Sequence, residues 1–239
     1  MTARTFVLIA GAWHGAWCWH KVAPLLEAQG HRVRTPELPA TGADLSDPSK
    51  VTLESWARFV AGAIAAEAES VILVGHSRGG VVISRAAELI PERIRRLVYV
   101  SGYLLAAGGT LAATARADSA SLVPPNMVPA AGGVTCRLRE SVIREALFSQ
   151  CTDTDYAFAL THMTPEPLKP LVTKLEVTDQ RFGRVPRAYV ECSQDRTITL
   201  PAQRRMQAAL PCESVLTLDS DHSPFLSHPQ PLAQWLGGL

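Results

Sequence analysis

The chain has 239 residues and a formal net charge of +1, with 47% hydrophobic and 19% charged residues. This length and apolar content suffice for a sizeable buried core and exclude an intrinsically disordered protein. The near-neutral charge gives no electrostatic reason to expect nucleic acid or an anionic membrane as a partner. No apolar run reaches membrane-spanning length without charge, and the N-terminus lacks a signal-peptide layout, so we expect a cytoplasmic protein.

The cysteines argue against a disulfide framework. Their number is odd, they are widely spaced, and no CxxC pair occurs. The same pattern disfavours a zinc site, and we expect no bound metal. We therefore expect free, buried or half-buried thiols in a reducing compartment at Cys18, Cys136, Cys151, Cys192 and Cys212.

In residues 1–102, short apolar runs alternate with amphipathic stretches. This pattern is typical of parallel strands joined by crossover helices. In chain order it predicts a buried strand at Phe6–Ala10, a helix over Cys18–Ala28, a strand at Arg32–Glu37, a helix over Leu53–Ala68 entered at Thr52, a strand at Val71–Val74, a helix after Ser77 that stops at Pro91, and a strand at Leu97–Val100.

The rhythm changes in residues 103–180, where glycines and prolines are frequent and strand-like runs disappear. Only two helical pieces are expected there, at Glu140–Phe148 and Asp153–His162. The pattern predicts a single α/β domain over residues 1–239, with a core formed by 1–102 and 181–239 and a cap insertion at 103–180. In 181–239 we expect a strand at Arg187–Cys192, a helix over Pro201–Leu210, a strand at Ser214–Leu218 and a helix near Pro231–Leu236.

The motif G-x-S-x-G occurs at Gly75–Gly79, directly after a predicted buried strand and directly before a predicted helix. A serine in that position sits on a tight, strained turn, and its hydroxyl is exposed at the carboxyl edge of the sheet. Small residues two before and two after it relieve the crowding. We predict Ser77 as a nucleophile, with the backbone N–H of Arg78 as an oxyanion donor.

A serine hydroxyl needs a base to take its proton, and the base needs an acid to orient it. This type of turn predicts the chain order Ser, Asp, His. Asp195 follows the strand predicted at Arg187–Cys192, and His222 follows the strand predicted at Ser214–Leu218. Both would lie at the same edge of the sheet as Ser77, so we predict Asp195 as the acid and His222 as the base.

Several neighbouring polar residues compete for these roles. Asp219 and Asp221 lie too close to His222 in sequence to orient it comfortably. His76 flanks the nucleophile, but its side chain should point away from that of Ser77, which favours a packing role.

The loop after the first strand should complete the oxyanion hole, and small residues there allow a close backbone approach. We choose the N–H of Ala12 as the second donor beside that of Arg78. Substrate contacts are predicted for Trp13, Leu104, Phe148 and His162, each of which has a packing alternative.

These residues resemble the α/β-hydrolase fold, specifically the plant methylesterase and hydroxynitrile lyase branch with its bacterial esterase relatives. The resemblance covers essentially the whole chain, loosely in the cap, and rests on residues 6–19, 24–33, 71–77, 181–183 and 221–222. It implies a six-stranded, mostly parallel sheet with an inserted cap, no cofactor, and a triad of Ser77, Asp195 and His222.

Two departures from the branch stand out. Ala10 occupies the place of a usual histidine before Gly11, and Arg78 occupies the place of a usual apolar residue after the nucleophile. The Arg78 side chain either recognises an acidic group on the substrate or pairs with a carboxylate elsewhere in the protein.

Within the branch, the lyases resemble a pattern with Thr in the first-strand loop and Lys after the catalytic His, where this chain has Ala12 and Ser223. The missing positive charge favours an esterase. We predict a serine carboxylesterase that hydrolyses a small or medium ester, with methyl esters among the candidates, through an acyl-enzyme. Alternatives are a thioesterase or cyclase on a biosynthetic acyl intermediate, a hydroxynitrile lyase, and a non-catalytic ligand receptor. The expected partner is a small-molecule ester, and the resemblance leaves a homodimer open.

Overall fold

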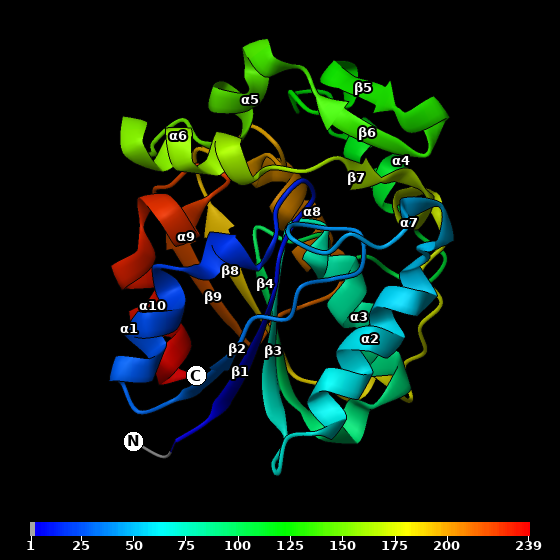
Figure 1. The fold of residues 1–239 in the computed structure, drawn as a ribbon. Helices are drawn as coiled ribbons and strands as arrows, with labels where there is room; N and C mark the ends of the chain where they lie inside the picture. The colour runs from blue at the N-terminus through cyan, green and yellow to red at the C-terminus, as the bar shows by residue number, and fades with distance from the viewer. Residues whose placement is uncertain (1–2) are drawn as a thin grey trace.

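A six-stranded sheet forms the centre of the computed structural model, which describes residues 3–239 (Figure 1). All neighbouring strands pair in parallel, so the mostly parallel sheet that the resemblance implied is confirmed. In spatial order the strands are β2 (Arg32–Arg34), β1 (Thr5–Ile9), β3 (Val71–His76), β4 (Ile94–Val100), β8 (Arg187–Cys192) and β9 (Ser214–Leu218).

Helices cover both faces of this sheet, because successive side chains of a buried strand point to opposite sides. In β1, Val7 and Ile9 join one apolar cluster, whereas Phe6 and Leu8 join the other. The first cluster includes α2 (Leu53–Ala65), α3 (Gly79–Leu89) and α8 (Leu200–Ala209), and the second includes α1 (Val22–Ala28), α9 (Pro224–Ser227) and α10 (Pro229–Gly238).

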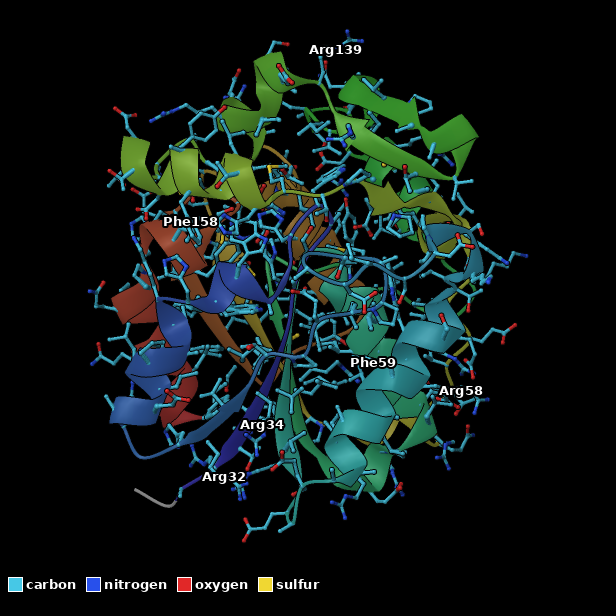
Figure 2. The ribbon with its side chains drawn as sticks, viewed as in Figure 1. Arg32, Arg34, Arg58, Phe59, Arg139 and Phe158 are labelled. Atoms are coloured by element: carbon cyan, nitrogen blue, oxygen red, sulfur yellow. The ribbon has the colours of Figure 1, made fainter. Side chains whose placement is uncertain are left out.

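Helix α2 shows how the local sequence determines where such a helix begins and which of its sides is buried. Its capping box at Thr52 and Ser55 satisfies backbone groups of the first turn, so the predicted start is confirmed. Arg58 points away from the sheet (Figure 2), and both Arg58 and Phe59 are exposed, while the opposite side of the helix is buried. The helix ends three residues earlier than expected, and Glu67 beyond its end pairs with Arg34 at 2.8 Å.

Two other elements near the N-terminus are shorter than predicted. A 3-10 turn at Ala16–Trp19 precedes α1, which begins at Val22 and carries Pro24 in its first turn, where the missing N–H is tolerated. Strand β2 spans only Arg32–Arg34, because Pro36 has no N–H to continue the pairing.

Most of residues 103–180 lies across the carboxyl ends of the main strands (Figure 1), whereas Thr178 lies near the C-terminal end of α3, where its N–H donates to Glu88. The two helices predicted there are confirmed as α5 (Glu140–Leu147) and α6 (Asp153–His162), but the expectation that strands are absent is wrong. A small antiparallel sheet forms from strands too short to show a period in the sequence. The segment also contains α4 (Leu111–Ala117), β5 (Met127–Ala130), β6 (Thr135–Leu138), β7 (Glu166–Pro167) and α7 (Leu168–Val172).

The remaining regular elements are short 3-10 turns, several of which begin with proline. They lie at Pro48–Lys50, Pro91–Arg93, Pro124–Asn126, Ala131–Gly133 and Phe182–Arg184. Across residues 3–239, no helix combines the length and hydropathy that a bilayer crossing needs.

Two helix glycines in very different surroundings allow a matched test of this packing. A Cβ at Gly80 of α3 would lie 2.6 Å from the Tyr103 carbonyl oxygen, whereas one at Gly62 of α2 would meet no atom within 4 Å. We expect Gly80→Ala to lower the free energy of unfolding by about 1–3 kcal/mol through overpacking. Gly62→Ala should raise it by up to about 1 kcal/mol through helix propensity. Urea denaturation measures both, and equal effects of the two substitutions would contradict the close approach at Tyr103.

Candidate active site

Ser77 lies on the tight turn between β3 and α3 and has a left-handed backbone with φ of 50°. Little room is left around it: a Cβ at Gly75 would lie 2.6 Å from the carbonyl oxygen of Gly79. The Ser77 carbonyl accepts hydrogen bonds from the N–H groups of Gly80 and Tyr103, both at 3.0 Å. The strained turn predicted from the motif is therefore present and is held by its neighbours.

Asp195 and His222 meet at the same edge of the sheet. Asp195 follows β8, His222 follows β9, and His222 Nδ1 lies 2.6 Å from Asp195 Oδ2. Both side chains are almost completely buried. The acid and the base chosen from the sequence are thus hydrogen-bonded to each other across 27 residues of chain.

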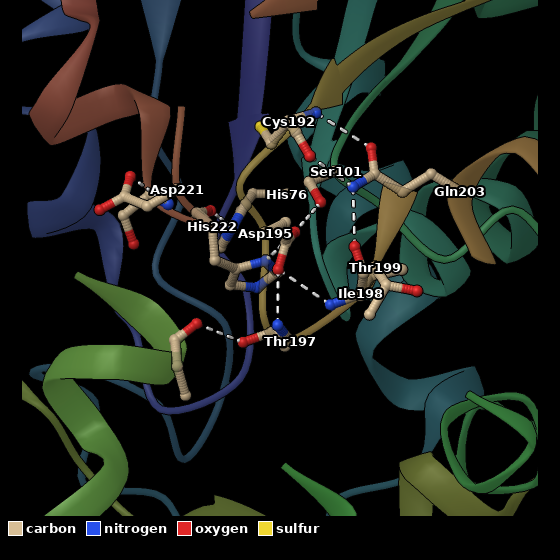
Figure 3. Close-up of polar contacts among 12 residues, drawn as sticks. His76, Ser101, Cys192, Asp195, Thr197, Ile198, Thr199, Gln203, Asp221 and His222 are labelled. Atoms are coloured by element: carbon tan, nitrogen blue, oxygen red, sulfur yellow. Dashed lines mark hydrogen bonds and ion pairs between the residues drawn. The ribbon is translucent and has the colours of Figure 1, made fainter. Parts of the chain in front are cut away.

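Asp195 is fixed by further donors (Figure 3). Its Oδ1 accepts the backbone N–H groups of Thr197 at 2.6 Å and Ile198 at 2.9 Å. Its Oδ2 also accepts the hydroxyl of Ser101, which follows β4 directly. Sequence reasoning missed Ser101, although the rule that selected Asp195 and His222, a polar residue just past a strand end, also selects it.

His76 does more than pack. Its Nε2 lies 2.9 Å from the carbonyl oxygen of His222 and donates a hydrogen bond to it. Burial, together with neighbouring His222 and His14, lowers the pKa of His76 well below its usual value. Burial likewise lowers the pKa of His14 to about 3, and its Nδ1 donates to the Ala12 carbonyl at 2.7 Å. Both rings are therefore neutral near pH 7.

The Asp221 carboxylate forms hydrogen bonds with residues other than His222. It accepts the backbone N–H of Gln150 at 2.8 Å and the hydroxyl of Ser227 at 2.8 Å. The sequence argument against Asp221 as the orienting acid is consistent with this arrangement.

The Arg78 side chain is buried and pairs with a carboxylate of the protein. Its Nε lies 2.9 Å from Glu166 Oε1 of β7, and its Nη2 donates to the Gly11 carbonyl at 2.9 Å. The guanidinium also lies 4.4 Å from the ring centre of Trp56. Of the two roles left open by the sequence, these contacts support pairing with a carboxylate of the protein, and recognition of an acidic substrate group stays an untested alternative. Glu166 had no signal in the sequence, since it lies in a two-residue strand of the irregular segment.

A cavity of about 170 Å³ opens at Ser77. Ala12 and Arg78, the predicted oxyanion donors, line it together with Trp13. Its other walls are mostly apolar and come largely from α4 and α7, namely Tyr103, Leu111, Ala112, Ala115, Arg116, Val123, Pro124, Met127, Leu168, Leu171, Val172 and Thr197.

Three of the residues predicted to contact substrate lie outside this cavity. Leu104 faces a separate surface depression beside α8. Phe148 is fully buried, with its ring centre 5.6 Å from that of His14. His162 is exposed, and its ring centre lies 4.2 Å from that of Phe158. The structure thus gives no support to these three predictions, because apolar or aromatic character in an insertion does not reveal which side faces the cavity.

The structure also shows how the cysteines and the possible metal ligands are arranged. Within residues 3–239, no group of three or more His, Cys, Asp or Glu side chains is arranged to hold a metal ion. All five cysteines are free, and four of them are buried.

Because His14 and His76 are neutral in the folded protein, we expect the protein to lose stability in acid. They bind a proton in the unfolded chain below about pH 6.5 but not in the folded protein, so the free energy of unfolding should fall as the pH drops from 6.5. The loss should reach up to about 1.4 kcal/mol per pH unit for each histidine. Urea denaturation at pH 7.5, 6 and 5 measures it, and His14→Gln should reduce the slope. An unfolding free energy that is constant over this range would contradict the neutral state of both rings.

Comparison with known proteins places the site in a family context. Residues 6–235 match the model of the "Alpha/beta hydrolase family". The chain is 31% identical to "Putative methylesterase 13, chloroplastic" of Arabidopsis thaliana, over 96% of this chain but only 54% of that protein, so it spans about half of that relative. It is 30% identical to "Methyl jasmonate esterase 1" of Vitis vinifera, over 98% of this chain and 95% of the relative.

The fold is similar to solved structures along its whole length. A methylesterase, MES16 from Arabidopsis, superimposes with a TM-score of 0.86 at 25% identity, covering 98% of this chain and 97% of that one. On the family match and these likenesses, the chain belongs to the alpha/beta hydrolase family, in the branch of the plant methylesterases.

Proposed function

We propose that this protein is a serine hydrolase that cleaves small or medium carboxylic esters, methyl esters among them. The observation that carries the proposal is the placement of Ser77. It lies on a strained turn in an apolar cavity, at the sheet edge where His222 and Asp195 are hydrogen-bonded. The curated relatives named as methylesterases support ester cleavage as the reaction.

The first half of the reaction forms an acyl-enzyme. His222 Nε2 takes the proton from Ser77 as its oxygen attacks the ester carbonyl, and Asp195 holds the ring and stabilises the imidazolium. The N–H groups of Ala12 and Arg78 stabilise the negative charge that forms on the carbonyl oxygen. When the tetrahedral intermediate collapses, His222 returns the proton to the departing alkoxide, which leaves as the alcohol.

The second half releases the acid. Water gives a proton to His222 and attacks the acyl carbonyl, and the same two N–H groups stabilise the second tetrahedral intermediate. Ser77 then leaves with a proton from His222. Each cycle consumes one ester and one water molecule and releases one alcohol and one acid. In this scheme, residues 103–180 act as the cap of the site, since α4 and α7 form most of the cavity wall.

The substrate class follows from the cavity. Its volume of about 170 Å³ is below the roughly 300–1,000 Å³ typical of sites for drug-sized ligands. Apolar side chains from α4 and α7 favour an aliphatic or aromatic group on the ester. A cytoplasmic location and a homodimer stay predictions.

The nucleophile is tested by the release of p-nitrophenol from p-nitrophenyl acetate. We expect the wild type to give a burst near one equivalent, and Ser77→Ala to lose the burst and at least about 10³-fold in kcat. Ser101→Ala is the matched serine control. It removes one of the donors to Asp195, so it should keep the burst with a slower rate. Retained turnover in folded Ser77→Ala would refute the assignment, and a thioester substrate run in parallel distinguishes a thioesterase.

Trp13 is expected to limit substrate size. It lines both the cavity at Ser77 and a second cavity of about 390 Å³ bounded by Leu138, Ile143 and other residues. Trp13→Ala should open the wall between them and raise kcat/KM for p-nitrophenyl octanoate, relative to the acetate, by at least about tenfold. The octanoyl chain has about six more methylenes than the acetyl group, and burying about two of them at about 0.8 kcal/mol each would supply a tenfold gain.

Leu160→Ala is the control for Trp13, because Leu160 lines only the second cavity. It should leave the octanoate-to-acetate ratio unchanged. If Trp13→Ala also leaves the ratio unchanged while acetate is still hydrolysed, Trp13 does not limit substrate size.

A further inference from the structure

The loop that follows β1 has nearly all of its peptide groups occupied. The Gly11 carbonyl accepts from Arg78 Nη2 at 2.9 Å, and the Ala12 carbonyl accepts from His14 Nδ1 at 2.7 Å. The Trp13 N–H donates to Glu166 Oε2 at 3.2 Å. The Ala12 N–H lies between these groups, at the cavity, and within residues 3–239 it has no protein acceptor.

Peptide geometry turns these contacts into an orientation. In a trans peptide the C=O of one residue and the N–H of the next lie in one plane and point in opposite directions. The Gly11 carbonyl accepts from Arg78 Nη2 at 2.9 Å and also from the backbone N–H of His14 at 3.3 Å, and these two hydrogen bonds together fix the direction of the Ala12 N–H. The following peptide plane is held at both ends, by His14 on the Ala12 carbonyl and by Glu166 on the Trp13 N–H.

The backbone of Trp13 shows that the loop needs such restraint. Trp13 has φ of 63°, a conformation that is strained for a bulky side chain. Its N–H and its carbonyl are both held from the 103–180 segment, by Glu166 and by the N–H of Thr164 at 3.1 Å. These contacts occupy the N–H of Trp13, whereas the N–H of Ala12, a residue that lines the cavity, is left without a protein acceptor within residues 3–239.

Arg78 can act as a fixed anchor because its own position is determined. It is fully buried, paired with the equally buried Glu166 at 2.9 Å, and stacked on Trp56. A guanidinium suits the task, since its Nε faces the Glu166 carboxylate in an ion pair while its Nη2 donates to the Gly11 carbonyl, an arrangement that a lysine ammonium reproduces less well.

We propose that the Arg78 guanidinium and Glu166 are positioning residues of the oxyanion hole: they orient the Ala12 N–H toward the oxyanion, next to the N–H that Arg78 itself supplies. The proposal rests on the proposed ester hydrolysis. It assigns the buried Arg78–Glu166 ion pair a role in turnover. It also means that Glu166, a residue of the 103–180 segment, helps to position the groups that react.

The test must separate positioning from stability, because a buried ion pair contributes to both. Removing one partner leaves an uncompensated charge, whereas replacing both by apolar residues often leaves stability unchanged or raised. The double variant Arg78→Met/Glu166→Leu therefore removes the anchor without stranding a charge. The control is Lys21→Met/Asp155→Asn, which removes another ion pair between the 103–180 segment and the rest of the chain, at 2.6 Å and away from the cavity.

The full chain is assayed with p-nitrophenyl acetate, and the affinity of an aryl trifluoromethyl ketone, which forms a hemiketal anion with the serine, is measured beside the melting temperature. We expect the double variant to lose about 10- to 100-fold in kcat, less than the 10²–10³ of a deleted donor, with KM within about twofold. Affinity for the ketone should fall by the same factor as kcat/KM. Arg78→Lys should retain the ion pair and show an intermediate loss. The control should match the wild type in every kinetic readout.

Each outcome decides the question. A folded double variant with wild-type kcat and ketone affinity overturns the proposal. If the double variant does not fold, Glu166→Gln, which keeps an acceptor for the Trp13 N–H, should still lower kcat and ketone affinity, and its failure to do so overturns the role of Glu166. A wild type without a burst or turnover instead refutes the proposed function, and the two failures are thereby distinguished.

Discussion

Ser77 holds a left-handed backbone between a buried strand and a buried helix, and such a conformation persists only where the surroundings determine it. The Ser77 N–H donates to Val100 of β4, and its carbonyl accepts from α3 and from Tyr103, where the 103–180 segment begins. The flanking glycines permit these approaches, since a Cβ at Gly79 would lie 2.8 Å from the Ile9 carbonyl. The turn therefore determines how closely α3 packs against the sheet, the course of the chain that follows β4, and the position of the serine.

The 103–180 segment contributes to the site as well as covering it. It contacts three different loops: the Ala146 carbonyl accepts from Thr197, the Gln150 N–H donates to Asp221, and Glu166 binds the loop after β1. Thr197 in turn donates its N–H to the carboxylate of Asp195. Substitutions in this segment should thus alter the geometry of the reacting groups as well as the shape of the cavity, which matters for any attempt to change substrate preference there.

The sequence predicted the parts of the molecule that local rules govern. Fully apolar runs such as β3, the capping residue Thr52 and the G-x-S-x-G motif each have a local physical cause, and the elements they imply are present. The approach of Asp195 to His222 was predicted because parallel strands place their carboxyl ends together. The small sheet β5–β6–β7 was missed, since its strands of two to four residues are too short for a period to show. Partners of the Arg78 guanidinium depend on tertiary approach and left no local pattern.

Burial in this site controls charge as well as position. The rings of His76 and His222 are 4.6 Å apart between centres, so a proton on His76 would oppose the imidazolium that forms when Ser77 loses its proton. Burial lowers the pKa of His76 and of His14, and both stay neutral at the pH where His222 must act as a base. In the proposed mechanism, the Asp195 carboxylate then stabilises the imidazolium without competition from these two rings. The burial that is expected to make the protein sensitive to acid would therefore also support the proposed base.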